Sequence, residues 1–148
     1  MLTTVGSASI ACSVADAFAF IADLRNDPRW HTDVLEARLV DGGAIGKDAT
    51  FEIKTKPVMG ISGGTVTISE YEPPSRVVFS TRMGKLQPVT TFTVVPEGAG
   101  CRVTRRIEME PPGLLRALTP LMGGMLRKSN TGFLKNLRGV LENGGNFA

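Results

Sequence analysis

Residues 111–141 read PPGLLRALTPLMGGMLRKSNTGFLKNLRGVL, and this stretch decides the fold. Its apolar residues recur at spacings of three and four, which places them on one face of a helix. The predicted face consists of Leu115, Leu118, Met122, Met125, Phe133, Leu137 and Leu141, with Ser129 in its one gap. The stretch therefore predicts a long C-terminal helix whose apolar face must be covered by another layer.

The start of this helix depends on Pro120. A proline inside a helix costs about 3 kcal/mol, whereas the first helical position tolerates it because that N–H has no partner there anyway. Thr119 and Pro120 form a suitable pair of capping and first residues, so we expect the main helix to run from Pro120 to about Asn143. Gly113–Ala117 is then a separate turn. The sequence leaves open whether Pro120 instead kinks a longer helix.

The residues before this stretch predict mainly strands. A first strand over 2–12 is followed by a short amphipathic helix over 14–24, for which Ser13 is a good N-cap. Asn26-Asp27-Pro28 ends that helix, and Pro28 opens a second short helix over 28–34. Further strands are predicted at 34–40, 50–57, 65–71, 76–82, 90–95 and 101–110.

The alternation of side chains in the last predicted strand puts an arginine on an apolar face. Arg105 shares its face with Val103, Ile107 and Met109. A buried arginine needs a partner, and Glu70, at the end of the face formed by the 65–71 strand, is the candidate. The alternative is a shifted register that leaves Arg105 in solvent.

The order of these elements resembles the helix-grip fold of the START-like or SRPBCC superfamily. The segments that carry the resemblance are VADAFAFIADLRNDPRWHTDV at 14–34, EYEPPSRVVFST at 70–81, TRRIEMEPPG at 104–113 and MLRKSNTGFLKNLRGVLE at 125–142. They are similar to bacterial proteins described as polyketide cyclase/dehydrase and lipid transport. The resemblance implies one α+β domain over 1–148, with a curved antiparallel sheet of six or seven strands wrapped round the C-terminal helix. It is specific for the fold and not for the function.

The resemblance also implies an apolar cavity between the sheet and the helix. The residues expected to line it are Trp30, Phe51, Ile53, Val66, Ile68, Phe79, Phe92, Val94, Arg105, Ile107, Met109, Leu118, Met122, Met125 and Phe133. Arg105 would anchor a carboxylate or phenolate of the ligand. Trp30 either covers a ligand at the mouth or plugs one end of the barrel.

Charge and composition exclude several classes of function. The net charge is +3, divided into −2 over residues 1–100 and +5 over residues 101–148. The basic last helix predicts a solvated face or, alternatively, docking to an acidic partner or to an anionic membrane surface. No motif or basic–aromatic pattern indicates nucleic acid, and no apolar run is long enough to span a membrane. The start of the chain lacks the pattern of a signal peptide, so we expect a cytoplasmic protein, and a homodimer remains open.

Metal and cofactor sites find no support in the sequence. Cys12, Cys101 and the single histidine do not form a ligand cluster, and we expect the two cysteines to be buried free thiols. Residues 60–64 match the letters of G-x-S-x-G but lack the strand-to-helix context of a nucleophile elbow. We therefore predict neither a metal nor a cofactor.

Three functions remain. The leading hypothesis is a carrier or sensor of a small hydrophobic ligand of lipid, polyketide or quinone type. The second is a cyclase, aromatase or dehydratase acting on a polyketide-like chain, for which His31, Tyr71, Thr81 and Arg105 are the candidate polar residues. The third is a protein-interaction module with a closed interior.

Overall fold

The fold is α+β, and a computed structural model describes residues 1–58, 60–111 and 113–143 of it. In chain order the elements are β1 (Leu2–Ile10), α1 (Val14–Ala22), the 3₁₀ helix η1 (Leu24–Arg29), β2 (Val34–Leu39), the 3₁₀ helix η2 (Val40–Gly42), β3 (Thr50–Val58), β4 (Ile61–Glu72), β5 (Arg76–Arg82), β6 (Val89–Glu97), β7 (Gly100–Met109), the 3₁₀ helix η3 (Gly113–Leu118) and α2 (Thr119–Glu142). This order confirms the predicted strands and the long C-terminal helix.

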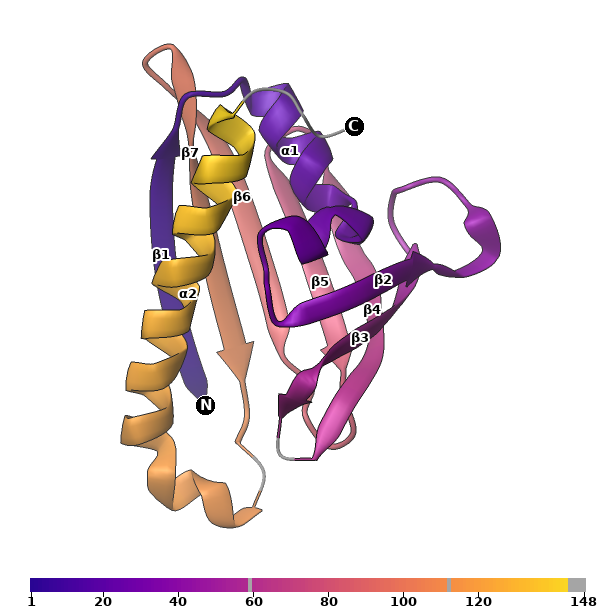
Figure 1. Cartoon of the computed structure of the whole chain (residues 1–148), viewed down its shortest axis with the longest axis vertical. Coiled ribbons are helices and arrows are strands. Elements are labelled where there is room, and N and C mark those ends of the chain that lie inside the picture. The colour runs from indigo at the N-terminus through magenta and orange to yellow at the C-terminus, as the bar shows by residue number, and fades with distance from the viewer. Residues whose placement is uncertain (59, 112, 144–148) are drawn as a thin grey trace.

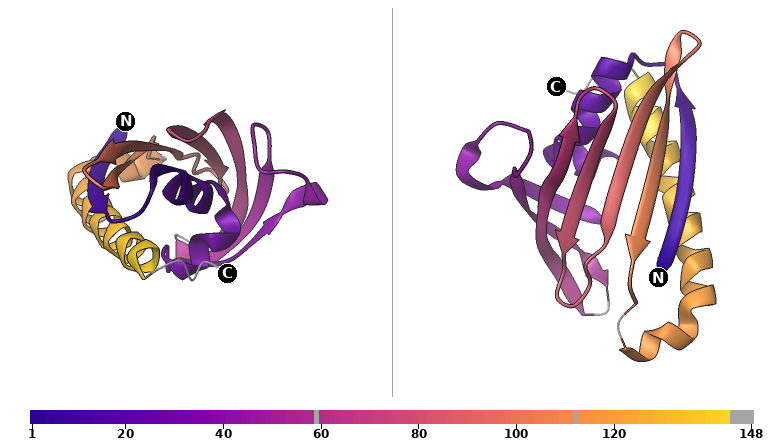
Figure 2. Two further views of the ribbon diagram at one scale, coloured as in Figure 1. Left: turned by 90° about the horizontal axis from the view of Figure 1, so that it is seen from above. Right: turned by 180° about the vertical axis from the view of Figure 1, so that it is seen from behind.

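The seven strands form one antiparallel sheet in the order β1-β7-β6-β5-β4-β3-β2. The sheet curves, and α2 runs along its β1 edge while α1 lies on the concave side (Figures 1 and 2). At the end of α2, Glu142 accepts a hydrogen bond from the Ala11 backbone N–H at 2.9 Å and so ties the helix to the end of β1. Among the described residues, no helix is both long enough and apolar enough to cross a membrane.

In the view of Figure 1, the helix α1 lies on the upper part of the concave side of the sheet. Ser13 caps it as predicted, because its side chain accepts a hydrogen bond from the Asp16 backbone N–H at 3.1 Å. Ala17, Phe18 and Ile21 are buried among sheet residues. This upper part is therefore solid core, and any interior space must lie below α1.

The predicted second short helix was wrong in position and type. It was expected over 28–34, but η1 spans Leu24–Arg29 and carries Pro28 inside it. Asp23 begins η1 by accepting a hydrogen bond from the Arg25 backbone N–H at 3.1 Å. This cap follows α1 directly, so the chain turns four residues earlier than the proline alone indicates.

The predicted start of the last helix is confirmed. The separate turn exists as η3, and Pro120 lies in the first turn of α2, where its missing N–H costs no hydrogen bond. The predicted apolar face was only partly right. Leu118 and Met125 are 48% and 63% exposed, Ser129 is exposed, and the side chain of Leu115 lies outside the described residues. The buried residues of α2 are Asn130, Leu134, Leu137 and Leu141.

Gly6 sets how closely α2 approaches the sheet. It lies on β1 opposite Arg105 of β7, directly under α2. A Cβ atom at this position would lie 2.9 Å from Asn130 Nδ2 and 3.0 Å from Leu134 Cδ1. Both side chains are buried, so neither is free to move away. The glycine therefore allows the contact that brings Asn130 over the sheet.

We expect the Gly6→Ala variant to lose about 1–3 kcal/mol of unfolding free energy, because the added methyl group overpacks the α2–β1 contact. Urea denaturation followed by circular dichroism measures the change. Gly139→Ala is the matched control, since nothing lies within 4 Å of a Cβ there. In a helix interior that change should stabilise by about 0.5–1 kcal/mol. Equal effects of the two substitutions would contradict the proposed role of Gly6.

Candidate functional site

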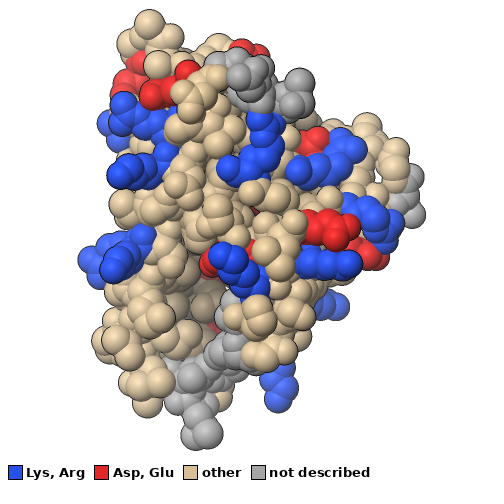
Figure 3. All heavy atoms as spheres, viewed as in Figure 1, with Lys and Arg blue, Asp and Glu red and all other residues tan. Residues whose placement is uncertain are grey.

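A cavity of about 480 Å³ lies below α1, between the sheet, η1 and the first half of α2. Figure 3 views the molecule from the side on which α2 faces the β2–β3 hairpin, and the surface is hollowed between them. Its lining residues are Leu24, Asp27, Trp30, His31, Asp33, Val34, Ile53, Thr55, Val66, Phe79, Thr81, Met83, Leu86, Pro88, Thr90, Phe92, Arg105, Ile107, Met109, Met122, Met125 and Leu126. The walls are therefore mostly apolar. The polar residues among them are Asp27, His31, Asp33, Thr55, Thr81, Thr90 and Arg105.

Most residues expected to line a cavity are in this lining. They are Trp30, Ile53, Val66, Phe79, Phe92, Arg105, Ile107, Met109, Met122 and Met125. Phe51, Ile68 and Val94 are buried in the hydrophobic core and are not part of the lining. Leu118 is exposed at the start of α2, and Phe133 lies behind His31 rather than in the lining.

Arg105 lies inside the protein, as the alternation along β7 predicted. It is 7% exposed, and its Nη1 donates a hydrogen bond to Asn130 Oδ1 at 2.9 Å. Asn130 in turn donates to the Arg105 backbone oxygen at 3.3 Å. The guanidinium carbon lies 5.5 Å from the ring centre of Trp30 and 5.7 Å from that of Phe92, so two aromatic faces stabilise its charge.

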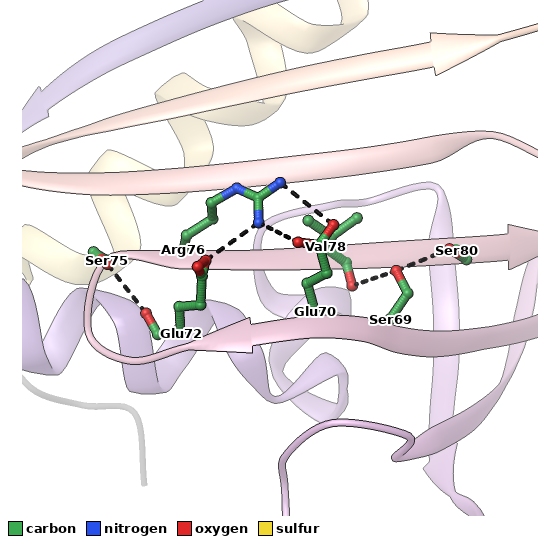
Figure 4. Close-up of polar contacts among 7 residues, drawn as sticks. All are labelled: Ser69, Glu70, Glu72, Ser75, Arg76, Val78 and Ser80. Atoms are coloured by element: carbon green, nitrogen blue, oxygen red, sulfur yellow. Dashed lines mark hydrogen bonds and ion pairs between the residues drawn. The ribbon is translucent and has the colours of Figure 1, made fainter.

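The expected pairing of Arg105 with Glu70 was wrong. Glu70 binds Arg76 instead, with Nη1 and Oε1 2.7 Å apart (Figure 4). The cause is a bulge between Ile68 and Glu70, where the pairing of β4 with β5 shifts by one residue. Because alternate residues of a strand point to opposite faces, one extra residue turns Glu70 outward.

The turn at the end of η1 brings three functional side chains to the cavity. The Asp27 backbone oxygen accepts hydrogen bonds from the Trp30 N–H at 3.0 Å and the His31 N–H at 2.7 Å. From α2, Asn136 Nδ2 donates to the Trp30 backbone oxygen at 3.2 Å. Trp30 is 1% exposed and lies edge-on to Phe92. It is therefore a buried part of the cavity lining.

Asp27 is a site residue that no sequence pattern indicated. Part of the residue reaches the surface, but its carboxyl group is enclosed. Burial raises the pKa of Asp27 to about 8, although the charge of Arg105 acts in the opposite direction. The indole N–H of Trp30 also favours the carboxylate, but its geometry falls short of a full hydrogen bond. At neutral pH the carboxyl group is therefore mostly protonated.

His31 is held as a neutral imidazole. Its ring stacks on Phe133 with ring centres 4.0 Å apart. Burial, followed by the nearby charge of Arg105, lowers the pKa of His31 to about 3. A histidine with so low a pKa does not act as an efficient base at neutral pH.

Four buried polar side-chain atoms have no hydrogen-bond partner among the described residues. They are Trp30 Nε1, His31 Nδ1, Thr55 Oγ1 and Arg105 Nε. All four belong to residues of the cavity lining. Unpaired buried polar atoms are rare and each requires an explanation, so their gathering at one cavity marks it as the candidate site.

The candidate catalytic residues divide into two groups. His31, Thr81 and Arg105 line the cavity. Tyr71 does not, because its ring packs on Phe18 of α1 at 5.6 Å in the core. Of the cysteines, Cys101 is buried and free, and Cys12 is free but only partly buried.

The outer face of α2 is basic. Arg127, Lys128, Lys135 and Arg138 of α2 are all exposed, and so is Arg116 in the preceding η3. In Figure 3 the lower end of α2 carries no charged side chain, in line with the exposure of Leu121 and Met125 there.

Comparison with known proteins gives a family. A family model described as "Polyketide cyclase / dehydrase and lipid transport" matches residues 1–142. No curated protein sequence matches the chain.

Solved structures share the fold at low sequence identity. TTHA0849 from Thermus thermophilus is 19% identical with a TM-score of 0.76, covering 97% of this chain and 99% of that chain. A START superfamily protein from Mycobacterium smegmatis is 16% identical with a TM-score of 0.68, covering 97% and 99%. The di-domain ARO/CYC StfQ from the steffimycin biosynthetic pathway is 14% identical with a TM-score of 0.74, covering 96% of this chain and 51% of that one.

We expect the imidazole of His31 to remain neutral from pH 8 to pH 5, because its burial beside Arg105 opposes protonation. As this is the only histidine, its ring protons are identified directly in a proton NMR titration. The control is the same titration in denaturing urea, where the midpoint should return to about 6.5. A midpoint near 6.5 in the folded protein would contradict this description of the site.

Proposed function

Because the chain belongs to the polyketide cyclase/dehydrase and lipid transport family, we propose that it binds a small hydrophobic ligand in the cavity between the sheet and α2. The cavity volume of about 480 Å³ supports this, since ligand sites usually measure about 300–1,000 Å³. The apolar walls from β3 to β7 and α2 suit a hydrocarbon or aromatic body.

One observation carries the proposal: the four residues that hold an unpartnered buried polar atom all line this one cavity. A solid core places apolar groups against each other and pairs its polar groups, because each unmade hydrogen bond costs about 1–3 kcal/mol. A ligand with a polar group explains why such atoms are tolerated together. A protein-interaction module with a closed interior has no use for them, so binding is favoured over that alternative.

An enzymatic use of the same cavity is the second candidate, favoured by the position of Asp27. Its carboxyl group exchanges a proton near neutral pH and lies beside a fixed cation, as general acid–base groups often do. The structural similarity to StfQ agrees with this candidate but extends to the fold alone. His31, with its low pKa, does not supply a second base. Binding therefore remains the first proposal.

Binding is measured through Trp30, the only tryptophan of the chain, whose ring lines the cavity. We expect 1-dodecanol to change the emission of Trp30 saturably, with one molecule bound per chain in native mass spectrometry. The Val66→Phe variant adds a ring to the cavity wall and should weaken this binding by about tenfold or more, equivalent to about 1.4 kcal/mol.

The matched control is Val95→Phe, which places the same ring on an exposed position of β6. Circular dichroism verifies that both variants are folded. Absence of binding by the wild type, or equal affinity in the two variants, is the result that rules out the proposed cavity as the site.

A further inference from the structure

The polar end of the cavity carries a positive charge without a counter-charge. Arg105 is buried, and among the described residues no carboxylate oxygen lies within ion-pair distance of its guanidinium. Its hydrogen-bonding partner Asn130 is neutral. Buried charges are normally paired, because the loss of hydration is otherwise not offset.

The charged and titratable groups around Arg105 do not supply the missing anion at neutral pH. Asp27 of η1 is near enough to Arg105 for the charge of Arg105 to lower the pKa of Asp27. Burial, and to a smaller extent the charge of Asp23, raise that pKa and keep Asp27 mostly protonated. His31, next along the chain, is neutral. Asp33 also lines the cavity but is not among the groups that shift the pKa of Arg105.

The described lining residues contributed by the other strands and by α2 are uncharged. The β3 and β6 strands contribute the threonines Thr55 and Thr90 to the lining, and α2 contributes Asn130. Among the described lining residues, Arg105 is therefore the one positively charged side chain.

We propose that the ligand is an apolar monocarboxylic acid whose carboxylate binds Arg105 at this end while its apolar body extends towards Met109, Met122 and Met125. This inference rests on the proposed function and adds the chemistry of the head group. Arg105 lines the cavity, its side chain is in contact with Trp30, and its guanidinium offers several N–H donors. A carboxylate has two oxygens and accepts from two such donors.

The position of Asp27 makes this binding depend on pH. An ionised Asp27 next to the bound carboxylate would place two negative charges against one guanidinium. The acid therefore binds the form in which Asp27 is protonated, and that form disappears as the pH rises through about 8. A neutral ligand of the same length has no such dependence.

The test compares dodecanoic acid with 1-dodecanol, using Trp30 emission at pH values from 6.5 to 9. For the wild type we expect the affinity for the acid to fall by about tenfold between pH 7 and pH 9, whereas that for the alcohol stays constant. In Asp27→Asn, the affinity for the acid should become independent of pH over this range. In Arg105→Gln, the acid should bind at least about tenfold more weakly at pH 7 and should lose more affinity than the alcohol, which carries no charge.

The outcomes separate the two proposals. If the alcohol binds and the affinity for the acid neither varies with pH nor responds to Arg105→Gln, the head-group inference is overturned and the proposed function stands. If the acid binds through Arg105 but Asp27→Asn leaves its pH dependence intact, the role of Asp27 is overturned. If neither compound binds, the proposed function itself fails.

Discussion

The buried contact between Arg105 and Asn130 is the interaction on which the site depends. It joins the middle of β7 to α2, and it forms because Gly6 on the neighbouring β1 strand leaves room for the helix to approach. Leu134, Leu137 and Leu141 then pack on the sheet beyond it. The contact fixes a cation under Trp30 and Phe92, and so gives an otherwise apolar cavity one polar end.

The helices after β1 shape both the core and the cavity. The α1 helix packs in the core, and Trp30 at the end of η1 is a buried part of the cavity lining. The same tight turn positions Asp27 and His31, whose pKa values burial moves in opposite directions. The core and the cavity share residues, among them Trp30, Phe79 and Phe92, so the packing of the core also shapes the cavity that Arg105 lines.

Local patterns predicted the elements well, because strand alternation and helix capping depend on neighbouring residues. Alternation along β7 correctly turned Arg105 inward, but its partner was not predictable. The bulge before Glu70 has no sequence signal that separates it from regular strand. Asn130 is polar, and helical periodicity identifies only apolar residues as inward-facing. Alternation also identified Phe51 and Ile68 as inward-facing without indicating that they are buried in the core rather than lining the cavity. Asp27 was missed because a turn residue becomes a site residue only through tertiary burial.

The central claim is that Arg105 and Asn130 serve the ligand at a cost to the stability of the empty protein. The most direct measurement is the unfolding free energy of the double variant Arg105→Met/Asn130→Leu, obtained by urea denaturation without ligand. Replacing a buried charged network by apolar residues of similar size is often neutral or stabilises by about 1–4 kcal/mol. We predict that the double variant is at least as stable as the wild type and no longer binds dodecanoic acid through this end of the cavity. A loss of several kcal/mol would show instead that the pair is needed for folding, and would contradict the account.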